Sequence, residues 1–417
     1  MTAGRHPQPV TVIRGSALLG SRVVQDSAVA FAGDRILYAG PHAGLHAALT
    51  AAAIDPDDVT ALPLAPGQLA VPGLVDVHNH GGHGVDFPSA TPASARNALH
   101  LMHAAGTTTV LASLVTASPA DLFSGLDILA GLAESGDAAG IHLEGPFLSA
   151  VRCGAQDPQW LRSPDAGFTE ELIDAARGHL RTMTYAPELP GADALVDQLA
   201  AHSVIPSLGH TAATAQDAEA SLRRAAAGLA ARRGMEAGGR AAVPTVTHLF
   251  NGMDPLHHRA PGAIAAALRA ARSGTAVVEL IADNTHLDPY VVASMFELLG
   301  ADNIVLVTDA MAAAGLSDGQ YRLGPAVVNV QGGVARLPSG ALAGGTASML
   351  DLVRNAVAAG VPAEDALHAA TEVPARILGM SGRIGTLAPG ASADILLVDA
   401  DLRLVRVLRR GLWITAA

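Results

Sequence analysis

The sequence has no lysine, so the 26 side chains counted as lysine or arginine are all arginine. This absence excludes Schiff-base chemistry on a lysine amine, a lysine general base, and a carboxylated lysine that bridges two metal ions. Cysteine occurs once, as Cys153, which excludes an internal disulfide and indicates a reducing compartment.

Aromatic residues and long apolar runs are also scarce. Aromatics make up 3% of the chain and the net charge is −12, so the chain lacks the stacking side chains and positive charge that nucleic-acid binding needs. No apolar run reaches the roughly 18 residues of a membrane span, and the amino-terminal MTAGRHPQPV lacks the basic and apolar parts of a signal peptide. We therefore expect a cytoplasmic protein that binds neither nucleic acid nor membranes.

From about residue 69 onward, short apolar or β-branched runs alternate with alanine-rich stretches of helical spacing. The eight runs are LAVPGLVDV (69–77), TTTVLASL (107–114), GIHLE (140–144), RTMTYAPE (181–188), SVIPSLGH (203–210), PTVTHLF (244–250), AVVELIAD (276–283) and NIVLVTD (303–309). Strands that alternate with helices pair in parallel, so the pattern predicts an α/β fold, a closed (β/α)8 TIM-like barrel. An open, doubly wound sheet is the alternative, but no GxGxxG turn follows the first strand.

Both ends of the chain depart from this pattern. The amino-terminal part contains short alternating runs such as VTVIRGSALL, and the carboxyl end contains ADILLVD and LRLVRVLRRGLWI, with turn residues between the runs. We expect residues 1–70 and 380–417 to form one small β-sandwich domain beside a barrel of residues 71–379. An alanine- and arginine-rich stretch from Ser221 predicts a helix that runs into a flexible loop.

Polar residues follow most of the predicted barrel strands, whose carboxyl ends meet at one mouth of a barrel. They are His78, His80, Glu144, His210, His248, Asp283 with His286, and Asp309. Strand alternation sends the imidazoles of His78 and His80 to the same side. Imidazoles and carboxylates gathered in this way predict a site for one or two divalent ions, such as zinc, iron, manganese or cobalt.

The ligand types also predict a chemistry. Water bound to such a metal ion loses a proton near neutral pH and becomes a nucleophile, and a nearby carboxylate can pass that proton to a leaving group. Asp309 follows the last predicted strand and is our candidate for this carboxylate. These residues predict a hydrolase that acts on an amide or related carbonyl, and by themselves they leave the substrate open.

Six motifs, in their order along the chain, resemble the N-acetylglucosamine-6-phosphate deacetylase family of the amidohydrolase superfamily. They are VPGLVDVHNHGGHG from Val71, HLEGPFLS from His142, LGHT from Leu208, THLFNGM from Thr247, HHRAPG from His257 and VTDAMAAAG from Val307. The resemblance extends from about Pro72 to Asp399. It implies a metal-dependent hydrolase that converts N-acetylglucosamine 6-phosphate into glucosamine 6-phosphate and acetate.

The resemblance also implies roles for individual residues. Glu144, His210 and His248 would hold the principal ion, with zinc the first expectation, and His78 and His80 would add a second ion that shares Glu144. Asp309 would be both a metal ligand and the acid/base. A phosphorylated N-acetyl amino sugar would be contacted by Asn251, Gly252, His258, Arg259 and His286. Part of its phosphate site would come from the neighbouring subunit of a homodimer, and arginine suits phosphate because it binds in a bidentate manner.

One position departs from the family pattern in a way that bears on catalysis. The family histidine that polarises the acetyl carbonyl is replaced by Gln156, which can donate a hydrogen bond to the carbonyl but carries no positive charge. We expect weaker turnover or a shifted substrate. The alternatives that stay open are deacetylation of a related N-acetylhexosamine phosphate, another amidohydrolase substrate, and a sugar-phosphate-binding protein with weak catalysis.

Overall fold

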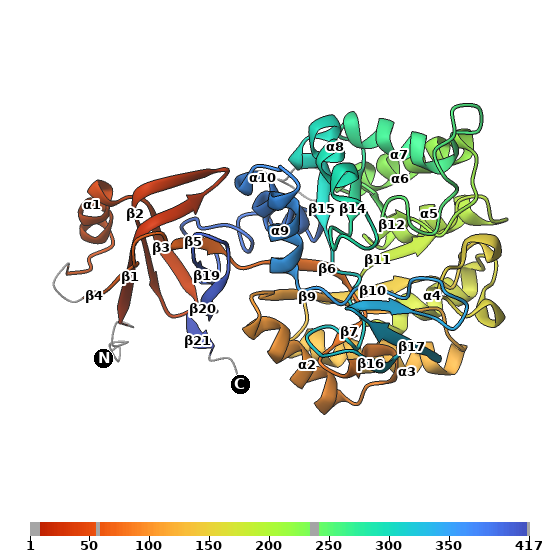
Figure 1. Cartoon of the computed structure of the whole chain (residues 1–417), viewed down its shortest axis with the longest axis horizontal. Coiled ribbons are helices and arrows are strands. Elements are labelled where there is room, and N and C mark those ends of the chain that lie inside the picture. The colour runs from red at the N-terminus through yellow and green to blue at the C-terminus, as the bar shows by residue number, and fades with distance from the viewer. Residues whose placement is uncertain (1–8, 56–58, 234–241, 415–417) are drawn as a thin grey trace.

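The computed structural model describes residues 9–55, 59–233 and 242–414, which form a barrel-like body with a smaller sheet domain beside it (Figure 1). Within these residues, one sheet has eight strands, joined by parallel pairing in chain order. They are β6 (Val75–Asn79), β9 (Thr109–Leu114), β10 (Gly140–Glu144), β11 (Leu180–Tyr185), β12 (Ile205–Leu208), β13 (Thr245–Val246), β14 (Val277–Leu280) and β15 (Ile304–Leu306).

The two edge strands of this sheet approach each other at their carboxyl ends. Asn79 forms a parallel bridge with Ala310, and the Asp309 amide donates to the His78 carbonyl at 2.9 Å. The sheet is therefore a nearly closed barrel of parallel strands, as the alternating pattern predicted.

Helices alternate with the strands and cover the outside of the barrel (Figure 1). They are α2 (Pro92–Ala104), α3 (Pro119–Glu134), α4 (Ala166–Ala175), α5 (Ala192–Ala201), α6 (Ala215–Arg233), α7 (Gly262–Arg272), α8 (Pro289–Leu299), α9 (Met349–Ala358), α10 (Ala363–Ala369) and α11 (Glu372–Ile377). In α3, the Ser118 side chain accepts from the Asp121 amide at the helix start, and Leu122, Leu126 and Leu129 form the buried face. Local capping and apolar spacing thus explain how such a helix begins and which side it buries.

Two predicted strand runs end differently in the structure. The run 69–77 is split at Pro72-Gly73, and its first part is β5 (Leu69–Pro72), which joins the smaller sheet. This strand crosses the domain boundary that we predicted between residues 70 and 71. The run 244–250 is a strand only over β13, because His248 and Phe250 have positive φ angles that leave extended geometry. The second difference places a histidine in a loop at the barrel mouth.

The smaller sheet is built from both ends of the described chain, as predicted. Its strands are β1 (Val10–Leu19), β2 (Arg22–Ala32), β3 (Arg35–Pro41), β4 (Val59–Pro63), β5, β19 (Ile395–Val398), β20 (Leu404–Arg409) and β21 (Leu412–Ile414), with α1 (Leu45–Ala51) packed beside them. Hydrogen bonds join them into one eight-stranded sheet, in which the two halves of the long β1 pair with β4 and with β5. Arg409 of β20 donates to the Thr108 carbonyl at 3.0 Å and so ties this sheet to the barrel.

Short strands after β6 and β15 complete the structure near the mouth. They are β7 (Gly81–Gly82), β8 (Val85–Asp86), β16 (Gly319–Leu323), β17 (Ala326–Gln331) and β18 (Val334–Arg336). The helix predicted from Ser221 is the later part of α6, while residues 234–241, where we expected a flexible loop, lie outside the described residues. Among the helices that the structure describes, none is both long and apolar enough to cross a bilayer.

Candidate active site and metal centre

The predicted ligands meet at the carboxyl ends of the barrel strands, and Glu144 lies at their centre. Its Oε1 is 3.0 Å from Nε2 of His210 and 3.0 Å from Nε2 of His248. Its Oε2 is 3.3 Å from Nε2 of His80. One carboxylate oxygen of Glu144 therefore faces the histidines that follow β12 and β13, and the other oxygen faces His80, which follows β6.

His78 and His80 face each other and Asp309. Their Nε2 atoms are 3.0 Å apart, so both imidazoles do lie on one side of the strand. Oδ1 of Asp309 is 3.3 Å from His78 Nε2 and 3.2 Å from His80 Nε2. The acid/base candidate thus lies against the first pair of histidines.

Two sets of three side chains have ligand atoms within 4.8 Å of one another: His78, His80 and Glu144, and Glu144, His210 and His248. Imidazole nitrogen with carboxylate oxygen is the donor set of borderline divalent ions such as zinc. Both sets are buried and share Glu144, so the geometry has room for one ion or two. The ligand types indicate a divalent metal.

The electrostatics of the cluster also fit a cation. Burial lowers the pKa of His78, but Asp309, Glu279 and Glu144 raise it more, to about 10, and the carboxylates likewise raise the pKa of His80 to about 9. Two protonated rings with their Nε2 atoms 3.0 Å apart would repel each other. A bound divalent cation would balance the same negative charge with both rings neutral, and so without that repulsion.

Three residues of the cluster have backbone conformations that are rare for residues other than glycine. The φ angles are +46° at His210, +28° at His248 and +45° at Asp309. Such strain costs about 1–3 kcal/mol per residue and persists where the surroundings impose it, often at functional sites. The fold therefore holds these three side chains in place at a cost in stability.

A cavity of about 220 Å³ opens over the cluster. It is lined by His80, Glu144, Gly154, Ala155, Gln156, His210, His248, Asn251, Gly252, His286, Asp309, Leu323, Ala341, Leu342 and Gly344. Gly252 has a φ of +61°, and a Cβ there would lie 2.8 Å from Nδ1 of His210, so only glycine lets the loop pass this histidine.

Gln156 lies in this lining with both ends of its amide engaged. Its Oε1 accepts from the Thr116 amide at 2.7 Å, and its Nε2 donates to Oε2 of Glu144 at 2.6 Å. One amide hydrogen remains for a ligand, because an amide nitrogen carries two. Gln156 therefore holds a central carboxylate in addition to facing the cavity.

The predicted phosphate residues divide into two groups. His286 lines the cavity, with its Nδ1 held by Asp283 Oδ2 at 2.7 Å, and Asn251 lines it too. His258 and Arg259 are exposed, contact each other at 2.8 Å, and lie outside the lining. Among the described residues that line the cavity there are four histidines and no arginine.

Sequence reasoning missed two buried side chains next to the cluster. Glu279 accepts from His78 Nδ1 at 3.0 Å, and the His142 ring centroid is 4.4 Å from that of His78. His142 bonds Ser113 and Thr184, and burial holds its pKa well below the ordinary value, so it is neutral. Both residues had a signal in the sequence. His142 is two residues before Glu144, so strand alternation places both side chains on the same face, and Glu279 is a charged residue within an apolar strand.

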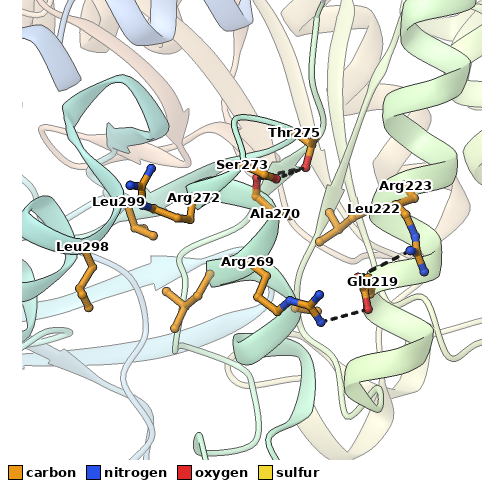
Figure 2. A pocket seen from close by; sticks show the side chains of 12 residues that line it. Glu219, Leu222, Arg223, Arg269, Ala270, Arg272, Ser273, Thr275, Leu298 and Leu299 are labelled. Atoms are coloured by element: carbon orange, nitrogen blue, oxygen red, sulfur yellow. Dashed lines mark hydrogen bonds and ion pairs between the residues drawn. The ribbon is translucent and has the colours of Figure 1, made fainter.

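A larger hollow lies elsewhere, outside the barrel between α6, α7 and α8 (Figure 2). It measures about 760 Å³, and Glu219 at its rim lies 3.6 Å from Arg223 and 3.5 Å from Arg269. The two metal-binding sets found in the described chain both lie at the barrel mouth and not in this hollow. The smaller cavity is therefore the candidate active site.

Comparison with known proteins agrees with this location. The model of the Amidohydrolase family matches residues 69–414. The chain is 35% identical over 350 residues to N-acetylgalactosamine-6-phosphate deacetylase of Escherichia coli O157:H7, covering 82% of this chain and 87% of that protein. It is 34% identical over 352 residues to N-acetylglucosamine-6-phosphate deacetylase of Bacillus subtilis (strain 168), covering 82% and 84%.

The fold also matches a solved structure with bound ligand. A mutant N-acetyl-D-glucosamine-6-phosphate deacetylase from Mycobacterium smegmatis, in complex with N-acetyl-D-glucosamine-6-phosphate, superimposes with a TM-score of 0.84. The two chains are 36% identical, and the match covers 98% of this chain and 99% of that one. The likeness therefore includes both the barrel and the smaller sheet.

Proposed function

Because the chain belongs to the amidohydrolase family, we propose that it hydrolyses the acetamide of N-acetylglucosamine 6-phosphate, giving glucosamine 6-phosphate and acetate. The observation that carries this proposal is the contact set of Glu144: two imidazoles at 3.0 Å on one oxygen, inside a cavity that Asp309 also lines. A metal-binding group beside a second carboxylate that faces the same cavity suits amide hydrolysis.

Asp309 is the acid/base of the proposed reaction. A divalent ion, when bound to Glu144, His210 and His248, supplies Lewis acidity that lowers the pKa of water and stabilises charge on the acetyl oxygen. Burial raises the pKa of Asp309, but positive charge on His78 and His80 lowers it below its usual range. A bound cation would lower it in the same direction when the rings are neutral, so the ionised carboxylate can accept a proton.

The proton transfers balance with one carboxylate. Asp309 takes a proton from water as the water oxygen bonds to the acetyl carbon. It then gives that proton to the amide nitrogen as the carbon–nitrogen bond breaks, which forms acetic acid and the amine. The acid passes its remaining proton to the amine or to water and leaves as acetate. Gln156 donates its remaining amide hydrogen to the acetyl oxygen while its other hydrogen holds Glu144.

We further propose that the phosphate site is completed by a second copy of the chain in a homodimer. The phosphate group carries charge that an arginine matches well, yet the described cavity lining contains none. Arg259 and His258 are exposed on the loop before α7, from which they could reach a neighbouring cavity. Asn251, Gly252 and His286 would contact the ligand from its own subunit.

The test is acetate release by metal-reconstituted protein. We expect release from N-acetylglucosamine 6-phosphate, much less from the unphosphorylated sugar, and almost none with Asp309→Asn, which keeps the shape but not the basicity. If folded, metal-loaded protein released no acetate from any N-acetylhexosamine phosphate, the deacetylase proposal would be wrong.

A second substrate has specific support. One relative, at 35% identity, acts by its name on N-acetylgalactosamine 6-phosphate. The identity to the N-acetylglucosamine-6-phosphate deacetylase of Bacillus subtilis (strain 168) is similar, at 34%. The two sugars differ only at one ring hydroxyl. Both should therefore be assayed side by side, and the larger kcat/KM names the substrate.

Three finer points belong to the same proposal. We propose zinc as the ion, because imidazole and carboxylate ligands at a hydrolytic centre suit it. We propose a cytoplasmic location, which the single, free Cys153 favours. We propose residues 1–70 and 380–417 as one domain and 71–379 as the other, with β5 extending the first by two residues.

A further inference from the structure

Glu279 is a buried carboxylate in the barrel to which the proposed reaction gives no role. It lies in the middle of β14 with 3% of its surface exposed. Val277 and Ile281, two residues before and after it, belong to the apolar cluster inside the barrel. An ionisable side chain among such neighbours is costly unless its oxygens receive hydrogen bonds.

The hydrogen bonds that Glu279 receives come from both metal-binding sets. Oε2 accepts from Nδ1 of His78 at 3.0 Å and from the backbone amide of His248 at 3.2 Å. The Glu279 carbonyl also accepts from the Leu249 amide at 2.9 Å. One residue therefore holds the ring of His78 and the strained backbone at His248, where φ is +28°.

The bond to His78 decides which of its nitrogens can bind a metal ion. An ionised carboxylate only accepts, so in the neutral ring that a metal ion requires, Nδ1 of His78 carries the proton and Nε2 keeps the lone pair. Nε2 is the atom that faces His80 at 3.0 Å. In the described structure Nδ1 of His80 has no such acceptor, so Glu279 orients one ring of the pair and not the other.

We propose that Glu279 is a positioning residue that couples the two metal-binding sets, an inference that rests on the proposed metal-dependent function. Through His78 it fixes the tautomer and increases the donor strength of one ligand. Through the His248 amide it fixes the loop that presents a ligand of the other set. Replacing Glu279 should therefore weaken metal binding at both sets, and not only at the set that contains His78.

The experiment measures metal affinity by competition with a chromogenic zinc chelator, for the wild-type protein and two variants. Glu279→Gln keeps the size and one acceptor oxygen but removes the charge, and Glu279→Ala removes both. We expect affinity about 10-fold lower for the first and up to about 100-fold lower for the second. Asp394→Asn is the matched control, because Asp394 is also a buried carboxylate but lies beside the smaller sheet.

Thermal unfolding with and without zinc separates positioning from general stability. If Glu279 acts on the metal site, its variants lose mainly the increase in Tm that zinc produces, whereas Asp394→Asn lowers Tm equally in both conditions. If Glu279→Ala does not fold, Glu279→Gln decides. Wild-type zinc affinity in every folded Glu279 variant would overturn the inference.

A double-mutant cycle identifies the route. With His78→Ala, the effect of Glu279→Gln on zinc affinity should shrink to the part that acts through the His248 amide. An undiminished effect would overturn the route through His78. If the wild-type protein itself bound no divalent ion, the proposed function would fail first, which distinguishes the two failures.

Discussion

The phosphate site that we propose to be shared between two chains makes a quantitative prediction for mixed dimers. Asp309→Asn removes the acid/base and should lower kcat by about 10²- to 10⁴-fold. Arg259→Ala would remove the proposed charge-assisted contact to phosphate and should lower kcat/KM by about 10- to 100-fold. Each variant alone should therefore keep at most about a tenth of the wild-type kcat/KM, for a different reason.

A heterodimer of these two variants should recover activity. If Arg259 acts in the partner's cavity, the chain that carries Arg259→Ala keeps its own Asp309 and receives an intact Arg259 from the other chain. One site of two is then complete, so the purified heterodimer should have about half of the wild-type activity, and an unsorted mixture about a quarter. The recovery arises because two-fold symmetry exchanges the loops.

The assay is acetate release by heterodimers isolated with two different affinity tags. The reciprocal control pairs a wild-type chain with a chain that carries both substitutions, and here no site is complete, so activity should be nearly lost. If Arg259 instead acts within its own chain, the two results exchange. That exchange, or a monomer with full activity, would refute the shared site.

Three further outcomes follow from the contacts of the site and the core. Gln156→Ala should lower kcat about 10²-fold, because this variant loses the hydrogen-bond donor to the acetyl oxygen. Gln156→His should raise kcat about tenfold, because it adds positive charge at the same position. A lower kcat for the histidine variant would contradict the role of Gln156 as that donor. Zinc at 1,000 times its Kd should stabilise the folded protein by about 4 kcal/mol, so removing zinc with a chelator should lower Tm. Glu144→Gln should abolish this dependence of Tm on zinc. If calorimetry showed that Tm of the variant still depends on zinc, Glu144 would not be the shared ligand. Leu126 lies in the fully buried face of α3, so Leu126→Ala should lower the free energy of unfolding, measured in urea, by about 3 kcal/mol and leave kcat unchanged. A changed kcat would show that α3 affects the active site.

Much of the candidate site was predictable because strand ends are visible in a sequence. His78, Glu144 and Asp309 each end or follow an apolar run, and parallel strands bring such ends to one mouth. The structure brings these three together with His210 and His248: the ligand atoms of each metal-binding set lie within 4.8 Å of one another, and Oδ1 of Asp309 is 3.3 Å from Nε2 of His78. The small sheet from both chain ends was likewise visible in alternating runs.

Other features depended on contacts between distant segments. The alternation near Pro72 did not reveal that β5 belongs to the smaller sheet, because a short apolar strand can pair with either neighbour. Glu279 looked like an interruption of a strand until its oxygen lay beside His78, 201 residues away in sequence. Gln156 looked like a free donor, yet it is tied to Thr116 and Glu144.

The sequence by itself determined the types of ligand, their order, and the alternation of strands and helices, since periodicity and residue chemistry are local properties of the chain. Only the tertiary structure decided which oxygen of Glu144 faces which histidine, that Glu279 contacts both His78 and the His248 amide, and that Arg259 lies outside the lining of the cavity in its own chain. The reason is physical: hydrogen bonds and cavities are set by distances across the barrel, and these follow from packing of all eight strands rather than from any one of them.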